Sequence, residues 1–128
     1  MAQFIYKENV CKLQFGNNEF ELPLNEQTAD EISKAFGDNV LPAKFESIAD
    51  LDTFYNNAMD SIDRVLGEGA AEAIMSGYKH AGALEIMGVI NFISTQWSEQ
   101  YKAVFEEMKQ TAHLPNRETR RANKGGRR

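Results

Sequence analysis

Apolar side chains recur every three or four positions over residues 83–112, and this periodicity predicts one α-helix of nearly thirty residues that Pro115 limits. At 1.5 Å per residue such a helix measures about 45 Å. Since this is long for a body of this size, we expect its C-terminal half to extend past the core. The apolar residues of that half then contact a second subunit or, as an equal alternative, pack back onto the second predicted helix. These candidate partner-binding residues are Trp97, Tyr101, Phe105 and Met108.

Residues 10–24 predict a β-hairpin. Apolar residues alternate along two short runs, at Cys11, Leu13 and Phe15 and then at Phe20, Leu22 and Leu24. Gly16-Asn17-Asn18 separates the runs, and glycine and asparagine tolerate the positive φ of tight turns. A two-stranded hairpin is marginal alone in water. It must therefore pack on helices or pair with strands of another copy.

Two helices are expected between the hairpin and the glycines at 67 and 69. Thr28-Ala29-Asp30-Glu31 fits a capping box, which starts the first helix after Thr28, and this helix ends near Phe36-Gly37. After Pro42, Ser47 is a suitable cap for the second helix. The apolar positions of the second helix are Ile48, Leu51, Phe54 or Tyr55, Ala58, Ile62 and Val65-Leu66.

A glycine-rich corner follows the second helix. We expect at least one of Gly67 and Gly69 to have positive φ, because the chain must turn there between two helices. A brief helix over residues 70–76 comes next, and Gly77 can close it in the left-handed conformation. The predicted fold class is α+β, mainly α, with an N-terminal β-hairpin followed by about four helices, the last one long.

Charge divides the chain into two predicted parts. Residues 1–114 carry 8 basic and 18 acidic residues, and residues 115–128 carry six basic residues and one acid. We expect a single folded domain over 1–114 and a disordered basic tail over 115–128. The tail can bind phosphates or carboxylates of a partner through Arg117, Arg120 and Arg121, or it can serve only as a solubilising end. No aromatic residues interleave with these arginines, so sequence-specific recognition of nucleic acid is not expected.

The residue types that carry chemistry are sparse, and no catalytic, cofactor-binding or metal-ligating residues are predicted. His80 and His113 have no second strong ligand at metal-binding spacing, and Cys11 reads as a small buried hydrophobe. Gly67-Glu68-Gly69 follows a helix and lacks the lysine of a phosphate-binding loop, so it reads as a turn. The carboxylates of Asp60-Asp63 and Glu106-Glu107 are typical of a solvated helix surface.

The same sequence features indicate the environment of the protein. A single cysteine and the absence of a secretory start predict a location in a reducing cytoplasm. The longest mostly apolar stretch, residues 81–93, is too short to cross a membrane. No membrane partner is therefore expected.

The run over residues 58–77, AMDSIDRVLGEGAAEAIMSG, resembles the tail assembly chaperones of long-tailed phages and prophages of Gram-positive bacteria. That family is similar in its hairpin start, its "LGEGA" corner and a later helix like residues 89–93 here. The likeness covers roughly residues 10–110 in the order of elements. Only the corner is sharply similar in sequence.

The resemblance implies a non-enzymatic protein of the bacterial host cytoplasm that forms multimers. Such proteins coat the hydrophobic tape measure protein, help to bring tail tube subunits to it, and leave before the virion is finished. The family implies no catalytic residue at any position of this chain. A nucleic-acid-binding accessory protein that acts through the basic tail is the alternative hypothesis.

Overall fold

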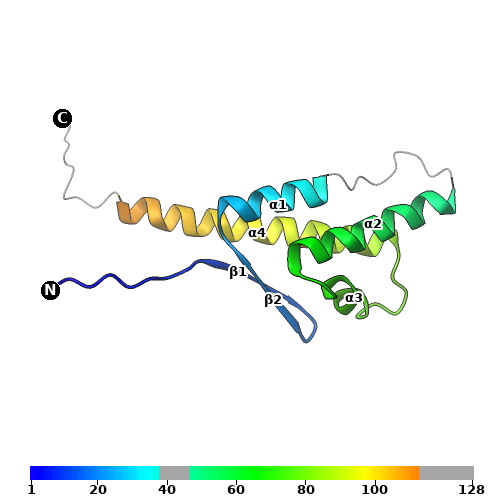
Figure 1. Cartoon of the computed structure of the whole chain (residues 1–128), viewed down its shortest axis with the longest axis horizontal. Helices are drawn as coiled ribbons and strands as arrows, with labels where there is room; N and C mark the ends of the chain where they lie inside the picture. Colours follow the sequence, from blue (N-terminus) through cyan, green and yellow to red (C-terminus); the bar gives the residue numbers. More distant parts are fainter. Residues whose placement is uncertain (38–46, 113–128) are drawn as a thin grey trace. The chain divides into compact units, whose positions relative to one another are not determined.

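The computed structural model describes residues 1–37 and 47–112, so that Pro42, His113 and the tail lie outside the described residues. Within the described parts, the chain forms a hairpin and then four helices, which confirms the predicted α+β, mainly α fold (Figure 1). The elements are β1 (Val10–Phe15), β2 (Asn18–Pro23), α1 (Glu26–Gly37), α2 (Ile48–Leu66), α3 (Ala70–Met75) and α4 (Ala83–Ala112).

The chain divides into two compact units, Met1–Ser98 and Glu99–Arg128. The boundary falls inside α4, so the first unit holds the hairpin, α1 to α3 and the first half of α4. The expected thirty-residue helix is confirmed. The expectation of one domain over residues 1–114 stays a prediction. Among the described residues, no helix is both long enough and apolar enough to cross a membrane.

β1 and β2 pair antiparallel from Val10 opposite Pro23 to Phe15 opposite Asn18. The turn is therefore one residue shorter than expected, because Asn18 already belongs to β2. Gly16 has φ 61°, a conformation that glycine adopts without steric cost. The side chains of β1 and β2 that alternate inward are buried in the core of the first unit, so this hairpin packs on the chain's own helices.

The start of α1 corrects a prediction. The side-chain Oδ1 of Asn25 accepts a hydrogen bond from the backbone N–H of Thr28 at 2.9 Å, and the helix begins at Glu26. Asn25 is therefore the cap, and the capping box starting at Thr28 is wrong. Thr28 instead lies buried in the first turn of the helix. The expected end near Phe36-Gly37 is confirmed.

α2 follows its sequence pattern closely. The Oγ of Ser47 accepts a hydrogen bond from the Asp50 backbone N–H at 3.2 Å, which confirms Ser47 as the cap. Ile48 is exposed, so the buried face of the helix begins later than expected. That face consists of Phe54, Ala58, Ser61, Ile62 and Val65.

Both corner glycines have positive φ, 116° at Gly67 and 86° at Gly69, which confirms the predicted turn. The corner also uses Asp63, whose Oδ1 accepts a hydrogen bond from the Ala71 backbone N–H at 2.8 Å. Since Gly69 has no side chain to cap α3, Asp63 supplies the acceptor from the preceding helix. Asp63 is thus a structural group, and its expected role as a solvated carboxylate is wrong. Gly77 does not have the positive φ that was expected to close α3.

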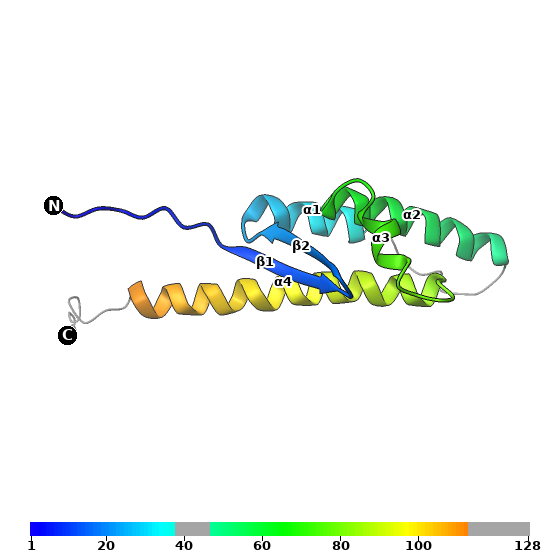
Figure 2. The same ribbon diagram turned by 90° about the horizontal axis from the view of Figure 1, so that it is seen from below.

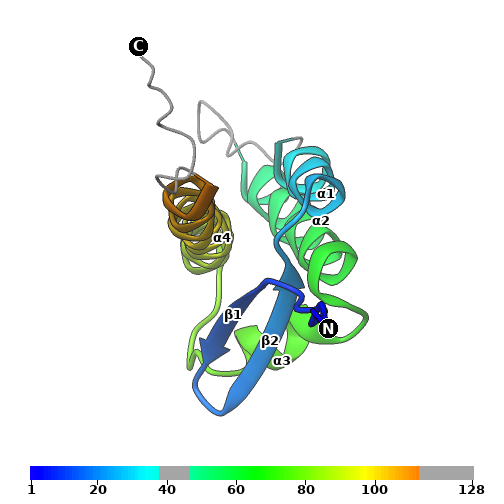
Figure 3. The same cartoon turned by 90° about the vertical axis from the view of Figure 1, so that its left-hand side faces the viewer.

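One hydrophobic core joins the elements of the first unit. Its members come from both strands, from α1, α2 and α3, and from α4 as far as Ile93. α1 packs beside α2, and β2 contacts α2 (Figures 2 and 3). The largest fully buried side chains among the described residues are Cys11, Ile62, Ile86 and Ile93. This core holds the tip of the hairpin next to α3 and the first half of α4.

Candidate protein-binding groove

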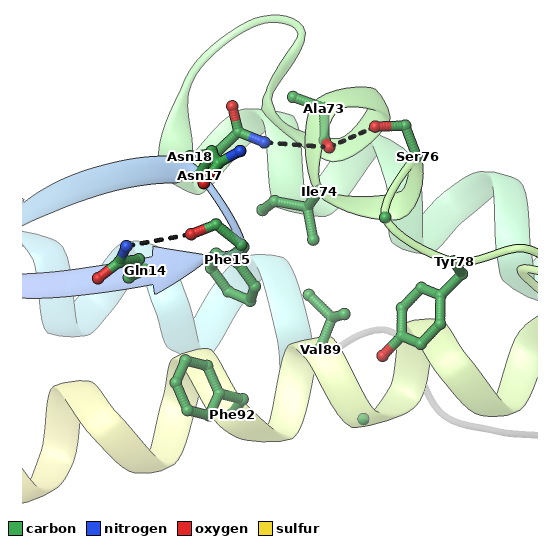
Figure 4. Close-up of a pocket in the computed structure, with 13 residues that line it drawn as sticks. Gln14, Phe15, Asn17, Asn18, Ala73, Ile74, Ser76, Tyr78, Val89 and Phe92 are labelled. Atoms are coloured by element: carbon green, nitrogen blue, oxygen red, sulfur yellow. Dashed lines mark hydrogen bonds between the residues drawn. The ribbon is translucent and has the colours of Figure 1, made fainter.

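An open groove of about 750 Å³ lies in the first unit, where the hairpin tip, α3 and the first half of α4 meet (Figure 4). We name it the hairpin groove. Its lining residues are Gln14, Phe15, Gly16, Asn17 and Asn18 of the hairpin, Ala73, Ile74, Ser76, Gly77 and Tyr78 of α3 and the segment after it, and Gly88, Val89 and Phe92 of α4.

Aromatic rings form much of the groove's apolar surface. The ring of Phe15 packs edge-to-face on Phe92 with centroids 5.4 Å apart, and on Phe20 with centroids 6.1 Å apart. Phe92 and Tyr78 remain 40% and 43% exposed. A monomer that leaves aromatic side chains in contact with water at one concave place has surface suited to a partner.

Gly88 on α4 leaves space in the lining of the groove. A Cβ placed on Gly88 would meet no atom within 4 Å, so this position faces free space. Glycine inside a helix costs about 0.5–1 kcal/mol relative to alanine. Gly88 therefore weakens α4 while it widens the groove.

One hydrogen bond attaches the hairpin tip to α3 at the polar rim, and two others lie within the rim's own segments. The Ala73 carbonyl accepts from Asn18 Nδ2 at 3.4 Å and from Ser76 Oγ at 2.7 Å. Gln14 Nε2 donates to the carbonyl of Gly16 at 3.0 Å. The rim thus consists of amides and a hydroxyl around an apolar floor. Among the described residues that line the groove, none carries a charged side chain. This surface suits an uncharged apolar segment of a partner.

Of the four predicted partner-binding residues on α4, Trp97 lies in the first unit. Its ring packs against the core, and Nε1 donates a hydrogen bond to the Pro23 carbonyl at 2.9 Å. The hydrogen bond therefore joins α4 to the end of the hairpin. A role for Trp97 in partner binding stays a prediction.

Tyr101, Phe105 and Met108 lie in the second unit. The rings of Tyr101 and Phe105 stack with centroids 6.4 Å apart, and Lys109 Nζ lies 5.9 Å from the Phe105 centroid. Phe105 is 52% exposed and Met108 56% exposed. The spacing 101, 105, 108 places these side chains on one helical face. The remaining candidates, Arg117, Arg120 and Arg121, lie outside the described residues.

Among the described residues, the groups considered for chemistry do not come together. Cys11 is fully buried, as expected, and desolvation by burial raises the pKa of its thiol above the ordinary value. His80 is exposed, and within residues 1–37 and 47–112 no three His, Cys, Asp or Glu side chains form a group that could hold a metal ion.

Sequence reasoning did not find the hairpin groove. Its aromatic residues Phe15, Tyr78 and Phe92 come from three separate segments, and no local pattern connects them. One available signal was Phe92, a large apolar residue beside the buried stripe that contains Ile90 and Ile93. A comparison with known protein families, with curated proteins and with solved structures finds no match to this chain.

Proposed function

We propose that the protein is a non-enzymatic assembly adaptor that binds an apolar segment of a partner protein in the hairpin groove. The observation that carries the proposal is the groove itself, an uncharged hollow with partly exposed aromatic side chains. Removing apolar surface from water stabilises a complex by about 25 cal/mol for each Å² buried. A client segment that covers Phe92 and Tyr78 would stabilise its complex with the protein in this way.

The groove suits a helix that presents one apolar face. Its volume of about 750 Å³ is enough for more than one large side chain. In this mode of recognition, anchors three or four residues apart on the client helix enter the groove together. The amides of the rim can then bond to polar groups of the client at the edge of the contact. A charged client residue at the centre would lose hydration without gaining a counter-charge.

For the client, we propose the tape measure protein of a long-tailed phage or prophage, in the cytoplasm of a bacterial host. Support comes from the resemblance of residues 58–77 to tail assembly chaperones and from the apolar character shared by client and groove. Self-association and contact with tail tube subunits belong to the same proposal. The adaptor would leave before the virion is complete.

The test is co-expression with the tape measure protein encoded in the same genome. Gly88→Leu fills the groove from a position with no atom near its Cβ, and leucine is also a better helix former than glycine. Thr95→Leu is the matched control, because Thr95 is exposed on the same helix and does not line the groove.

Wild type and Thr95→Leu should keep the tape measure protein soluble and co-purify with it. Gly88→Leu should weaken the complex at least tenfold while its circular dichroism and melting temperature stay at or above those of wild type. Equal binding by Gly88→Leu would refute the groove as the client site. No complex with any variant would refute the tape measure protein as the client.

The alternative is a nucleic-acid-binding accessory protein, which the six basic residues of 115–128 favour. Duplex DNA is the probe. On this alternative its affinity falls steeply with added salt and is lost when Arg117, Arg120 and Arg121 become alanine. The adaptor hypothesis expects the tape measure complex to survive those three substitutions.

A further inference from the structure

Residues 1–6, which we name the N-terminal arm, expose an apolar segment ahead of the hairpin. Phe4, Ile5 and Tyr6 are 75%, 80% and 90% exposed, and the rings of Phe4 and Tyr6 pack edge-to-face with centroids 5.0 Å apart. Figure 2 shows the arm continuing away from the hairpin tip. Three adjacent large apolar side chains in water form a surface that a partner would stabilise.

The arm and the hairpin groove have matching chemistry. No residue of the arm, Met-Ala-Gln-Phe-Ile-Tyr, has a charged side chain, and the first charged side chains follow at Lys7 and Glu8. The groove likewise lacks charge among its described lining residues. Its aromatic floor suits Phe4 and Ile5, and its amide rim can bond to the hydroxyl of Tyr6.

The arm points away from the groove of its own chain. The groove lies at the Phe15 end of β1, whereas the arm leaves at the Val10 end. A strand of six residues separates these two ends by about 17 Å. The backbone N–H of Leu24 donates to the Asn9 carbonyl at 3.0 Å, which extends the hairpin pairing past Val10. This bond sets the direction of the arm. A return to its own groove would require a reversal within Lys7 and Glu8.

We propose that the N-terminal arm of one copy docks in the hairpin groove of a second copy. The two surfaces differ, so the contact is heterologous and each copy can give one arm and receive another. The protein therefore multimerises head to tail, into a ring or an open chain. If the groove also binds the client, which rests on the proposed function, the client displaces the arm and the multimer opens.

The experiment uses two variants that each lack one half of the contact. In the arm variant, Phe4, Ile5 and Tyr6 become serine, at exposed positions that the fold does not need. In the groove variant, Gly88 becomes leucine. Tyr78→Glu is a second groove variant, because it brings a charge into the groove from a partly exposed position. Sedimentation velocity gives the mass of each over a series of concentrations, with Thr95→Leu as control.

Wild type and Thr95→Leu should grow in mass with concentration, whereas the arm variant and both groove variants should remain monomeric. An equimolar mixture of arm and groove variants should form one-to-one dimers and nothing larger. The reason is that only the groove variant's arm and the arm variant's groove are intact, so one contact forms per pair.

Three results would overturn the inference: a monomeric wild type, an arm variant that multimerises like wild type, or a mixture that stays monomeric. In the second case another surface, such as the face with Tyr101 and Phe105, would hold the copies together. In the third case the arm and the groove would not be the two halves of one contact. No client is present in this experiment. Its failure therefore leaves the client test of the groove standing, and failure of the client test leaves arm exchange standing.

Discussion

Trp97 gives the sharpest test of the packing in the first unit. Its indole packs on the core, and Nε1 donates to the Pro23 carbonyl at 2.9 Å, so the side chain joins α4 to the end of the hairpin. Truncating a buried tryptophan to alanine costs about 3–5 kcal/mol, and Trp97 is only partly buried. We therefore expect Trp97→Ala to lower the free energy of unfolding by about 3 kcal/mol.

Two further variants separate the contribution of the Trp97 hydrogen bond from that of aromatic packing. Trp97→Phe keeps an aromatic ring but loses the hydrogen bond to Pro23, and we expect a loss of about 1 kcal/mol. Phe105→Ala removes a ring that is half in solvent on the same helix, and we expect a loss nearer 0.5 kcal/mol. At roughly 4 °C for each kcal/mol, the melting temperature should fall by about 12 °C, 4 °C and 2 °C for Trp97→Ala, Trp97→Phe and Phe105→Ala.

The assay is thermal and urea unfolding followed by circular dichroism. Fluorescence is unsuitable because Trp97 is the single tryptophan of the chain and two of the variants remove it. Equal stability losses for Trp97→Ala and Phe105→Ala would refute the reasoning. If Trp97→Ala also dissociated multimers while leaving the monomer's stability unchanged, Trp97 would be a subunit contact instead of a core residue.

Two other predictions concern backbone conformation and ionisation. Gly67→Ala and Gly69→Ala should each lower the free energy of unfolding by about 1 kcal/mol or more in urea titrations, because φ is positive at both positions. A Cβ at either position would meet no atom within 4 Å, so the cost comes from the backbone conformation and not from a clash. Two substitutions without effect on stability would contradict this. Cys11 should react with a thiol reagent far more slowly in the native protein than in urea. Burial raises the pKa of the Cys11 thiol in the folded state. The contribution of the neutral thiol to protein stability is therefore fully present at pH values below the thiol pKa of the unfolded chain. This contribution is lost as the pH rises towards the thiol pKa of the folded protein. A Cys11→Ala variant that loses stability just as steeply on the alkaline side would refute this assignment.

Local sequence determined the elements whose preferences are short-range. The alternation over residues 10–24 predicted the hairpin, Ser47 predicted the start of α2, and Gly67 and Gly69 predicted the corner. In each case the deciding interaction joins residues close in the chain, such as Ser47 with the amide of Asp50. The apolar spacing of residues 83–112 predicted α4, because it follows from the helical repeat alone.

Tertiary structure decided the features that depend on distant residues. Asn25 and Thr28 are both good caps by type, and α1 begins with Asn25 in that role while Thr28 lies buried. The hydrogen bond of Asp63 to Ala71 exists because the corner folds α3 back towards α2.

The hairpin groove is the clearest case of a feature that the tertiary structure decided. Phe15, Ile74 and Phe92 lie far apart in sequence, and each alone reads as an ordinary apolar residue. A helix or strand period specifies which face is apolar, but not how much of that face the neighbouring elements cover. Only the packing of the hairpin on α3 and α4 shows that Phe92 and Tyr78 remain partly uncovered, because burial depends on contacts between segments far apart in the chain.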